Sequence, residues 1–259
     1  MTTTETTEPW QPLITPGPAS QWITGLDEQL TSAHLRADLP LPVGRGGWQT
    51  VQTANSFWLL GLFGDGCNLA IRTCFDPQGL QTVTPGEQTP TTISYQIDGS
   101  LGQFSVRVEW FEGTPALFRY TTSLEPRQAF SVQAFPRDLY LLDEQYRPAP
   151  EGMIYVAQDG PTSGLAYLTV TEPATGSLLY FQNLTALNDY CQATGAEPGG
   201  TVAVQWPEAG FMLPVGTEPL PAGKPVILSD AFLWLNDTRL DNEFMAAEQF
   251  IEAMAGVYR

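Results

Sequence analysis

The chain has 259 residues, of which 42% are hydrophobic, enough for one large β domain or two small domains with a buried core. Its 28 acidic and 11 basic residues give a net charge of −17, so we expect neither nucleic acid nor an anionic membrane as a partner. No apolar run reaches the ~18 residues of a membrane helix, and the first residues lack the features of a secretory signal, so we expect a cytoplasmic protein.

The beginning of the chain predicts two kinds of structure. Residues 1–20 combine Thr, Glu and Pro with few apolar side chains, which is typical of a disordered leader. Trp22, Leu26 and Leu30 then recur at i, i+4 and i+8, the spacing of a short amphipathic helix. We therefore expect the folded part to begin at residue 21.

Short apolar segments separated by Gly- and Pro-rich turns dominate the rest of the chain. In 104–111, apolar residues alternate with polar ones, which indicates a half-buried antiparallel strand, and a turn signal predicts a hairpin with 116–124. The pattern predicts an all-β fold: a large antiparallel β-sandwich over 21–240, with the short N-terminal helix and a C-terminal amphipathic helix. The predicted strands are 48–61, 68–75, 104–111, 116–124, 153–159, 165–171, 177–182, 201–206 and 226–235.

Residues 241–259 predict the C-terminal helix. An apolar stripe recurs there at helical spacing, and the acidic start suits a helix N-terminus. Two hypotheses stay open: the helix packs on its own domain, or the Phe244–Tyr258 segment contacts a protein partner or a catalytic domain missing from this chain. The stripe consists of Phe244, Ala247, Ile251, Met254 and Tyr258.

Cysteine and histidine usage restricts the chemistry. Cys67, Cys74 and Cys191 lack the spacing of a zinc site or a disulfide framework, so we expect buried free thiols. The single histidine, His34, leaves no histidine-rich metal site, and the glycine motifs of nucleotide-binding folds are absent. We therefore expect no cofactor and no metal.

Two segments, YFQNLTALNDYC at 180–191 and QWPEAGF at 205–211, hold polar residues that suit a sugar. Amide and carboxylate side chains can bind sugar hydroxyls in a planar, bidentate way, while an aromatic ring covers the apolar sugar face. The alternative is structural: the first segment forms a short helix capped by Asn183 or Asp189, and Trp206 closes an edge of the sandwich. The candidate carbohydrate-binding residues are Asn183, Asn188, Asp189, Tyr190, Trp206 and Glu208.

An enzymatic function would need carboxylates. Glycoside hydrolysis uses two carboxyl groups about 5 to 9 Å apart. Four acids, in otherwise apolar or aromatic stretches, are candidates for such a pair: Asp138, Asp189, Glu208 and Asp230.

Several segments together resemble one known architecture. They are similar to the N-terminal β-super-sandwich that precedes an (α/α)6 barrel in bacterial six-hairpin glycosidases and phosphorylases, over about residues 30 to 259. The segments are GGWQTVQTANSFWLLGLFG, LFRYTTSL, FPRD, YFQNLTALNDYC, QWPEAGF and ILSDAFLWL.

This resemblance implies an accessory domain that packs on a helical barrel and is not hydrolytic alone. In that family the catalytic acids belong to the barrel, which this chain lacks, so no catalytic residue is carried over. The first hypothesis is therefore a non-catalytic, carbohydrate-associated domain. The alternatives are a carboxylate-dependent hydrolase or lyase acting on carbohydrate, and a structural or interaction protein without a small-molecule ligand.

Overall fold

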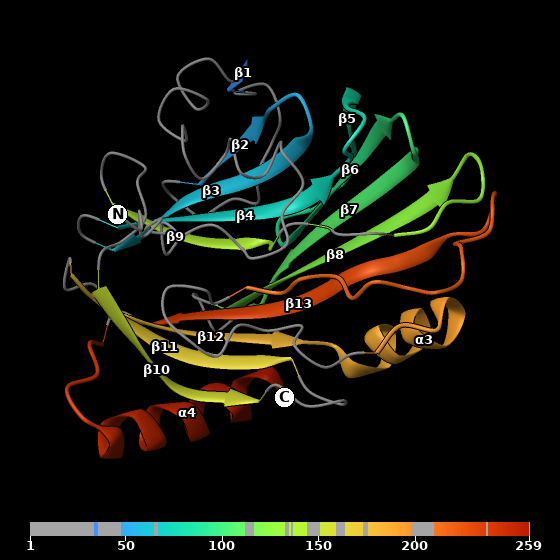
Figure 1. Cartoon of the computed structure of the whole chain (residues 1–259). Coiled ribbons are helices and arrows are strands. Elements are labelled where there is room, and N and C mark those ends of the chain that lie inside the picture. The colour runs from blue at the N-terminus through green and yellow to red at the C-terminus, as the bar shows by residue number, and fades with distance from the viewer. Residues whose placement is uncertain are drawn as a thin grey trace, which may run out of the picture.

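The computed structural model describes residues 34–35, 48–64, 67–111, 117–132, 135, 137–143, 151–158, 164–172, 176–197, 210–236 and 238–258. Two antiparallel sheets make up this part of the chain, and the smaller sheet lies over one face of the larger (Figure 1), which confirms the predicted all-β sandwich. The predicted leader, the N-terminal helix and the strand 201–206 lie outside the described residues.

Each sheet has a simple strand order. The smaller sheet runs β1 (His34–Leu35), β2 (Gln49–Gln52), β3 (Ser56–Gly64), β4 (Cys67–Phe75) and β9 (Leu139–Asp143). The larger runs β10 (Glu151–Gln158), β11 (Leu165–Glu172), β12 (Ser177–Gln182), β13 (Val226–Asn236), β8 (Leu117–Pro126), β7 (Gly102–Trp110), β6 (Thr92–Gly99) and β5 (Leu80–Gln88).

The structure confirms most of the predicted strands and adds others. The predicted hairpin is β7 paired with β8, and the segment 48–61 is the antiparallel pair β2 and β3. Strands β5, β6 and β9 are not among the strands predicted from the sequence. In β5 only Val83 is buried, so this edge strand offers little apolar alternation to detect.

The main core lies between the sheets, where side chains of β3 and β4 meet those of the larger sheet. Phe57, Leu59, Leu69 and Ile71 contribute from the smaller sheet and are almost fully buried. Strand β11 is buried on both faces, because Ala166, Leu168 and Val170 enter this core while Leu165 and Tyr167 enter a second cluster. Burial on both faces explains why 165–171 reads as nearly continuous apolar sequence.

The second cluster lies under the C-terminal helix α4 (Glu243–Val257), which covers the outer face of β10, β11 and β12 (Figure 1). The Asn242 side chain caps α4 by accepting hydrogen bonds from the first helical N–H groups. Ala246 and Ala253 are buried against the sheet, and a Cβ on Gly256 would lie 1.5 Å from Cζ3 of Trp234. Close approach of helix and strand therefore requires glycine at that position. Among the described residues, no helix has the length and hydropathy needed to cross a bilayer.

The other described helix, α3 (Leu184–Thr194), follows β12 and lies at the end of the larger sheet (Figure 1). Its N-cap is Asn183, and it ends at Gly195, whose φ of 65° is in the left-handed region that favours glycine. Leu187, Tyr190 and Cys191 are buried and join the main core. The short helix that sequence analysis gave as the structural alternative for 180–191 is therefore present.

Candidate functional site

The most polar buried site centres on Asp138, which lies immediately before β9. Its main chain is held on both sides: its carbonyl accepts from the Arg72 N–H at 2.6 Å, and its N–H donates to the Phe211 carbonyl at 3.1 Å. The Phe211 N–H in turn donates to Asp138 Oδ1 at 2.8 Å. A Cβ on Gly210 would lie 2.6 Å from that carboxylate oxygen, so glycine permits this approach.

The Asp138 carboxylate bonds to side chains of two strands of the larger sheet, and the network continues to a third. The hydroxyls of Tyr120 on β8 and Tyr180 on β12 both donate to Asp138 Oδ2, the latter at 2.6 Å. Gln182 donates to the Tyr180 hydroxyl at 2.6 Å and to Ser229 Oγ at 3.0 Å. Ser229 closes the network by donating to the Tyr120 hydroxyl at 3.3 Å. We call these five residues the Asp138 cluster, and it connects the two sheets through hydrogen bonds.

Burial controls the protonation of this cluster. It raises the pKa of Asp138, and the hydrogen bonds donated by Tyr120, Tyr180 and the Phe211 N–H partly oppose the shift. Burial also raises the pKa of both tyrosines well above the ordinary value, and the neighbouring carboxylate adds to the shift. The tyrosines therefore remain protonated donors, as the geometry requires.

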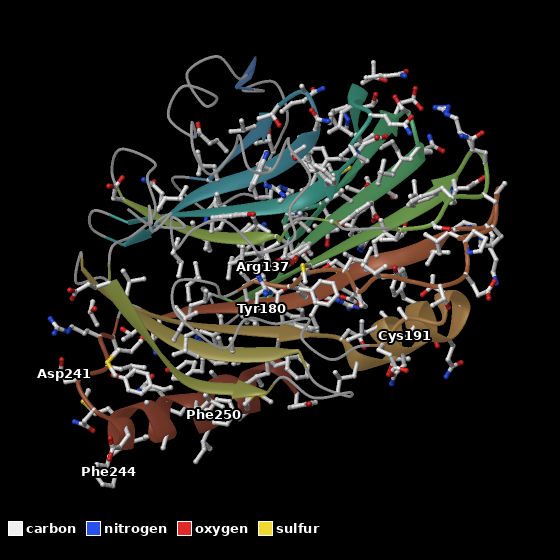
Figure 2. All side chains as sticks on the ribbon, viewed as in Figure 1. Arg137, Tyr180, Cys191, Asp241, Phe244 and Phe250 are labelled. Atoms are coloured by element: carbon white, nitrogen blue, oxygen red, sulfur yellow. The ribbon has the colours of Figure 1, made fainter. Side chains whose placement is uncertain are left out.

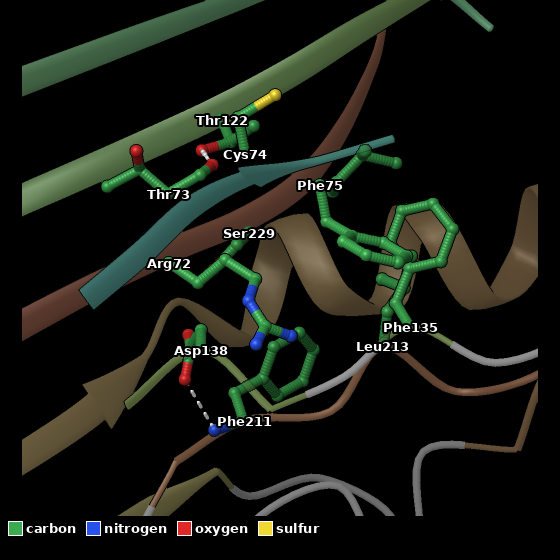
Figure 3. Close-up of a pocket in the computed structure, with 11 residues that line it drawn as sticks. Arg72, Thr73, Cys74, Phe75, Thr122, Phe135, Asp138, Phe211, Leu213 and Ser229 are labelled. Atoms are coloured by element: carbon green, nitrogen blue, oxygen red, sulfur yellow. Dashed lines mark hydrogen bonds between the residues drawn. The ribbon is translucent and has the colours of Figure 1, made fainter. Parts of the chain in front are cut away.

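A cavity of about 50 Å³ opens beside the Asp138 cluster (Figure 3). Arg72 on β4 lines it and is only 4% exposed. The β3–β4 pair shifts register beside Arg72, pairing Phe57 with Cys74 but Trp58 with Arg72, and such irregularities re-aim side chains. The remaining lining residues are Thr73, Cys74, Phe75, Thr122, Phe135, Asp138, Phe211, Leu213, Leu228 and Ser229.

A second buried acid, Asp230 on β13, anchors the start of α3. Arg119 holds it in a bidentate ion pair, with both N···O distances at 2.6 Å. Asn183 Nδ2 donates to Asp230 Oδ2 at 2.8 Å, while Asn183 Oδ1 accepts from the Thr185 N–H at 3.0 Å. The Asn183 amide is thus both the cap of α3 and a link to the sheet.

The structure separates the residues predicted to bind carbohydrate. Asn183 and Tyr190 point inward, and the Tyr190 hydroxyl donates to the Pro214 carbonyl at 2.8 Å in a buried position. Asn188 and Asp189 are exposed on α3. The other two candidates, Trp206 and Glu208, lie outside the described residues. Binding of sugar by any of these residues stays a prediction.

The four candidate carboxylates also have different surroundings. Asp138 and Asp230 are buried, 6% and 2% exposed, and each is occupied by its own set of donors. Asp189 is exposed on α3, and Glu208 lies outside the described residues. Within the described ranges, no group of three or more His, Cys, Asp or Glu side chains is placed to hold a metal ion. Cys74 and Cys191 are free and buried, as predicted, while the Cys67 side chain is not described.

The outer face of α4 is the most apolar exposed surface of the helices. Phe244, Ile251 and Tyr258 are 80%, 67% and 71% exposed. Figure 2 shows Phe244 pointing away from the sheet and Phe250 lying on the side of the helix that faces it. Most of the stripe singled out in the sequence therefore faces outward, and the helix packs on its own domain through the neighbouring face. The two hypotheses for this helix are compatible.

Three residues of this site, Arg72, Tyr120 and Tyr180, are not among those predicted from the sequence. A signal for Arg72 was available, because a single charge within the apolar strand CNLAIRTCF has to be either paired or placed at a site. The tyrosines carried no such signal, since tyrosine is common in strands whether or not its hydroxyl has a role.

Comparison with known proteins adds no assignment: no protein-family model matches this chain, and no curated protein is significantly similar to it.

Proposed function

We propose that this chain is a non-catalytic, carbohydrate-associated β-sandwich domain that docks through the outer face of α4 onto the helical domain of a carbohydrate-active protein. The observation that carries the docking part is the exposed line formed by Phe244 and Ile251 on α4, which Tyr258 extends at the end of the helix. Soluble domains place most large apolar side chains of a packed helix toward the core, and a contiguous exposed line of them marks an interaction surface.

The spacing of this line favours a helix as the occupant. Phe244 and Ile251 are seven residues and about 10 Å apart on one side of α4, and Tyr258 follows at the C-cap, where its ring edge contacts Phe181 of β12. Seven-residue apolar spacing is the pattern by which two helices pack side by side. Exposed Glu243 and Glu248 flank Phe244, which predicts arginine or lysine beside the apolar ridge of the partner.

The carbohydrate part of the proposal has separate support. It comes from the resemblance to the super-sandwich domains of six-hairpin glycosidases and from the types of the exposed residues, Asn188 and Asp189, on α3. The two-sheet fold with a C-terminal helix agrees with what that resemblance implies. The occupied state of Asp138 and Asp230, whose oxygens already accept internal hydrogen bonds, supports a non-catalytic role for these two acids.

Photo-crosslinking in the source cells tests the docking surface. A benzophenone amino acid replaces Phe244 or Ile251, and a matched control carries it at Val215, which is 54% exposed on another part of the surface. We expect crosslinks from the two α4 positions, but not from Val215, to map onto a helix of a carbohydrate-active protein. Crosslinks only to further copies of this chain, or equal labelling from Val215, would contradict the proposal.

A thermal-shift screen of the purified chain against mono- and oligosaccharides tests the carbohydrate part. A ligand at 100 times its dissociation constant adds about 2.7 kcal/mol of stability, which gives a shift of several degrees. We expect the shift to be lost in Asn188→Ala and Asp189→Asn, both of which replace exposed side chains. Sugar hydrolysis by the purified chain that is lost in Asp189→Asn would show instead that the chain is an enzyme.

A further inference from the structure

Arg72 is a buried cation whose hydrogen-bonding capacity is only partly used. Its side chain is 4% exposed, and its Nε and Nη1 atoms are buried without a hydrogen-bond partner in the part of the chain that the structure describes. The ion pairs between described residues do not include Arg72, although the Asp138 carboxylate acts on its charge. A guanidinium stays charged in proteins. A buried N–H group that makes no hydrogen bond destabilises the folded state.

Burial lowers the pKa of Arg72, and its neighbours, first the Tyr140 hydroxyl and then the Asp138 carboxylate, oppose that shift. The Arg72 guanidinium carbon lies 4.4 Å from the Trp58 ring centroid and 5.3 Å from that of Tyr140. Cation–π contacts of this kind attract the charge through the ring face. The ring faces do not accept N–H groups at the edge of the guanidinium, so Nε and Nη1 can donate to an oxygen ligand.

These free donors belong to a residue that lines the cavity. Figure 3 shows the Arg72 side chain reaching from β4 toward Asp138 and Phe211, among the other lining residues. The cavity volume of about 50 Å³ is roughly three to five times the 10–15 Å³ that one water requires on the same measure. A molecule of about four or five heavy atoms therefore fits.

The other polar groups of the cavity already have partners. The hydroxyl of Thr122 donates to the Thr73 carbonyl, and that of Thr73 donates to the Phe57 carbonyl at 3.1 Å. Ser229 donates to Tyr120, and the Asp138 oxygens accept from two tyrosines and a backbone N–H. Of the lining residues that the structure describes, Arg72 thus carries the donors without a partner, and the rest of the wall is mainly apolar, with phenylalanine and leucine side chains.

We propose that this cavity binds a small aliphatic monocarboxylate, with its carboxylate on the Arg72 guanidinium and its alkyl end against the apolar wall. A carboxylate carries one negative charge, which one guanidinium balances, and its oxygens accept charge-assisted hydrogen bonds from N–H groups. Phosphate or sulfate would need more donors than the wall offers, and a dianion would be repelled more strongly by Asp138. This site is separate from the α4 surface and does not depend on the function proposed above.

A titration with sodium propionate at constant ionic strength tests the proposal. The readouts are the arginine Nε–Hε resonances in ¹⁵N NMR spectra and the affinity by calorimetry, with propionamide as the uncharged isostere. We expect saturable binding of propionate that shifts the Arg72 resonance. Propionamide and inorganic phosphate should each bind at least tenfold more weakly than propionate. Equal affinity for propionate and propionamide, tighter binding of phosphate, or no saturation by 100 mM propionate would overturn the proposal.

Variants separate the site from general ion effects. Arg72→Gln removes the charge, whereas Leu228→Phe keeps the charge and fills the cavity. Both variants should therefore weaken the binding of propionate at least tenfold. Arg127→Gln removes an exposed arginine and should change the affinity less than twofold. If Arg72→Gln does not fold, Leu228→Phe and propionamide decide the question. Propionate binding that survives Leu228→Phe, or that Arg127→Gln weakens equally, would overturn the assignment.

Discussion

Substitution of Asn183 tests whether the polar start of α3 is a structural element. Asn183→Ala removes an N-cap, worth about 1 kcal/mol, and a hydrogen bond to the charged Asp230. Hydrogen bonds to charged groups contribute about 1.5–3 kcal/mol, and the lower end applies because Arg119 already pairs with Asp230. We therefore expect a loss of about 2–3 kcal/mol in the free energy of unfolding. For a chain of this size that is a fall in Tm of roughly 5–10 °C.

Matched variants divide this effect into its two parts. Asn183→Ser keeps a capping oxygen but loses the contact with Asp230, so urea unfolding should show about half to two-thirds of the loss. Asn188→Ala, an exposed position on the same helix, should change stability by less than about 0.5 kcal/mol. If Asn183→Ala is neutral, or if Asn188→Ala destabilises equally, the structural role of the Asn183 amide is refuted.

Three further predictions concern close packing and protonation. Gly256→Ala would place a methyl group against Trp234. Replacing glycine in a helix usually increases stability, but here we expect the clash to loosen α4 and to speed amide hydrogen exchange throughout the helix. Unchanged exchange would contradict that packing. Burial raises the pKa of Asp138 above its unfolded value of about 3.9, so its contribution to stability is fully present below that pH and is lost as pH rises through the folded pKa. The stability difference between wild type and Asp138→Asn, measured by urea unfolding, should therefore shrink as pH rises above about 4, and a growing difference would reverse the sign we assign. Burial also raises the pKa of the Cys74 thiol, so Ellman's reagent at pH 8 should label it only as fast as the protein opens; labelling as fast as in urea would show an accessible thiol.

The sequence determined the fold class and the helix at its end because these follow from local patterns. Alternation of apolar and polar residues in 104–111 places one face of a strand in the core, and helical spacing in Phe244–Tyr258 predicts α4. Strand β5 lacks such a local pattern. Only Val83 of its residues is buried, so apolar and polar residues do not alternate clearly at this exposed edge.

Tertiary structure decided which polar residues meet and which faces are covered. Asp138 joins Tyr120 and Tyr180 because strand register brings together positions 18 and 42 residues away from it along the chain, and no local pattern encodes that register. The same holds for α4: its apolar residues span more than one face, and the sheet selected the face with Ala246, Ala253 and Gly256, whose small size permits close approach to Trp234. Met245, Phe250, Met254 and Val257 fill the space beside these small residues, and Phe244 and Ile251 stay exposed because they lie on the opposite side of the helix.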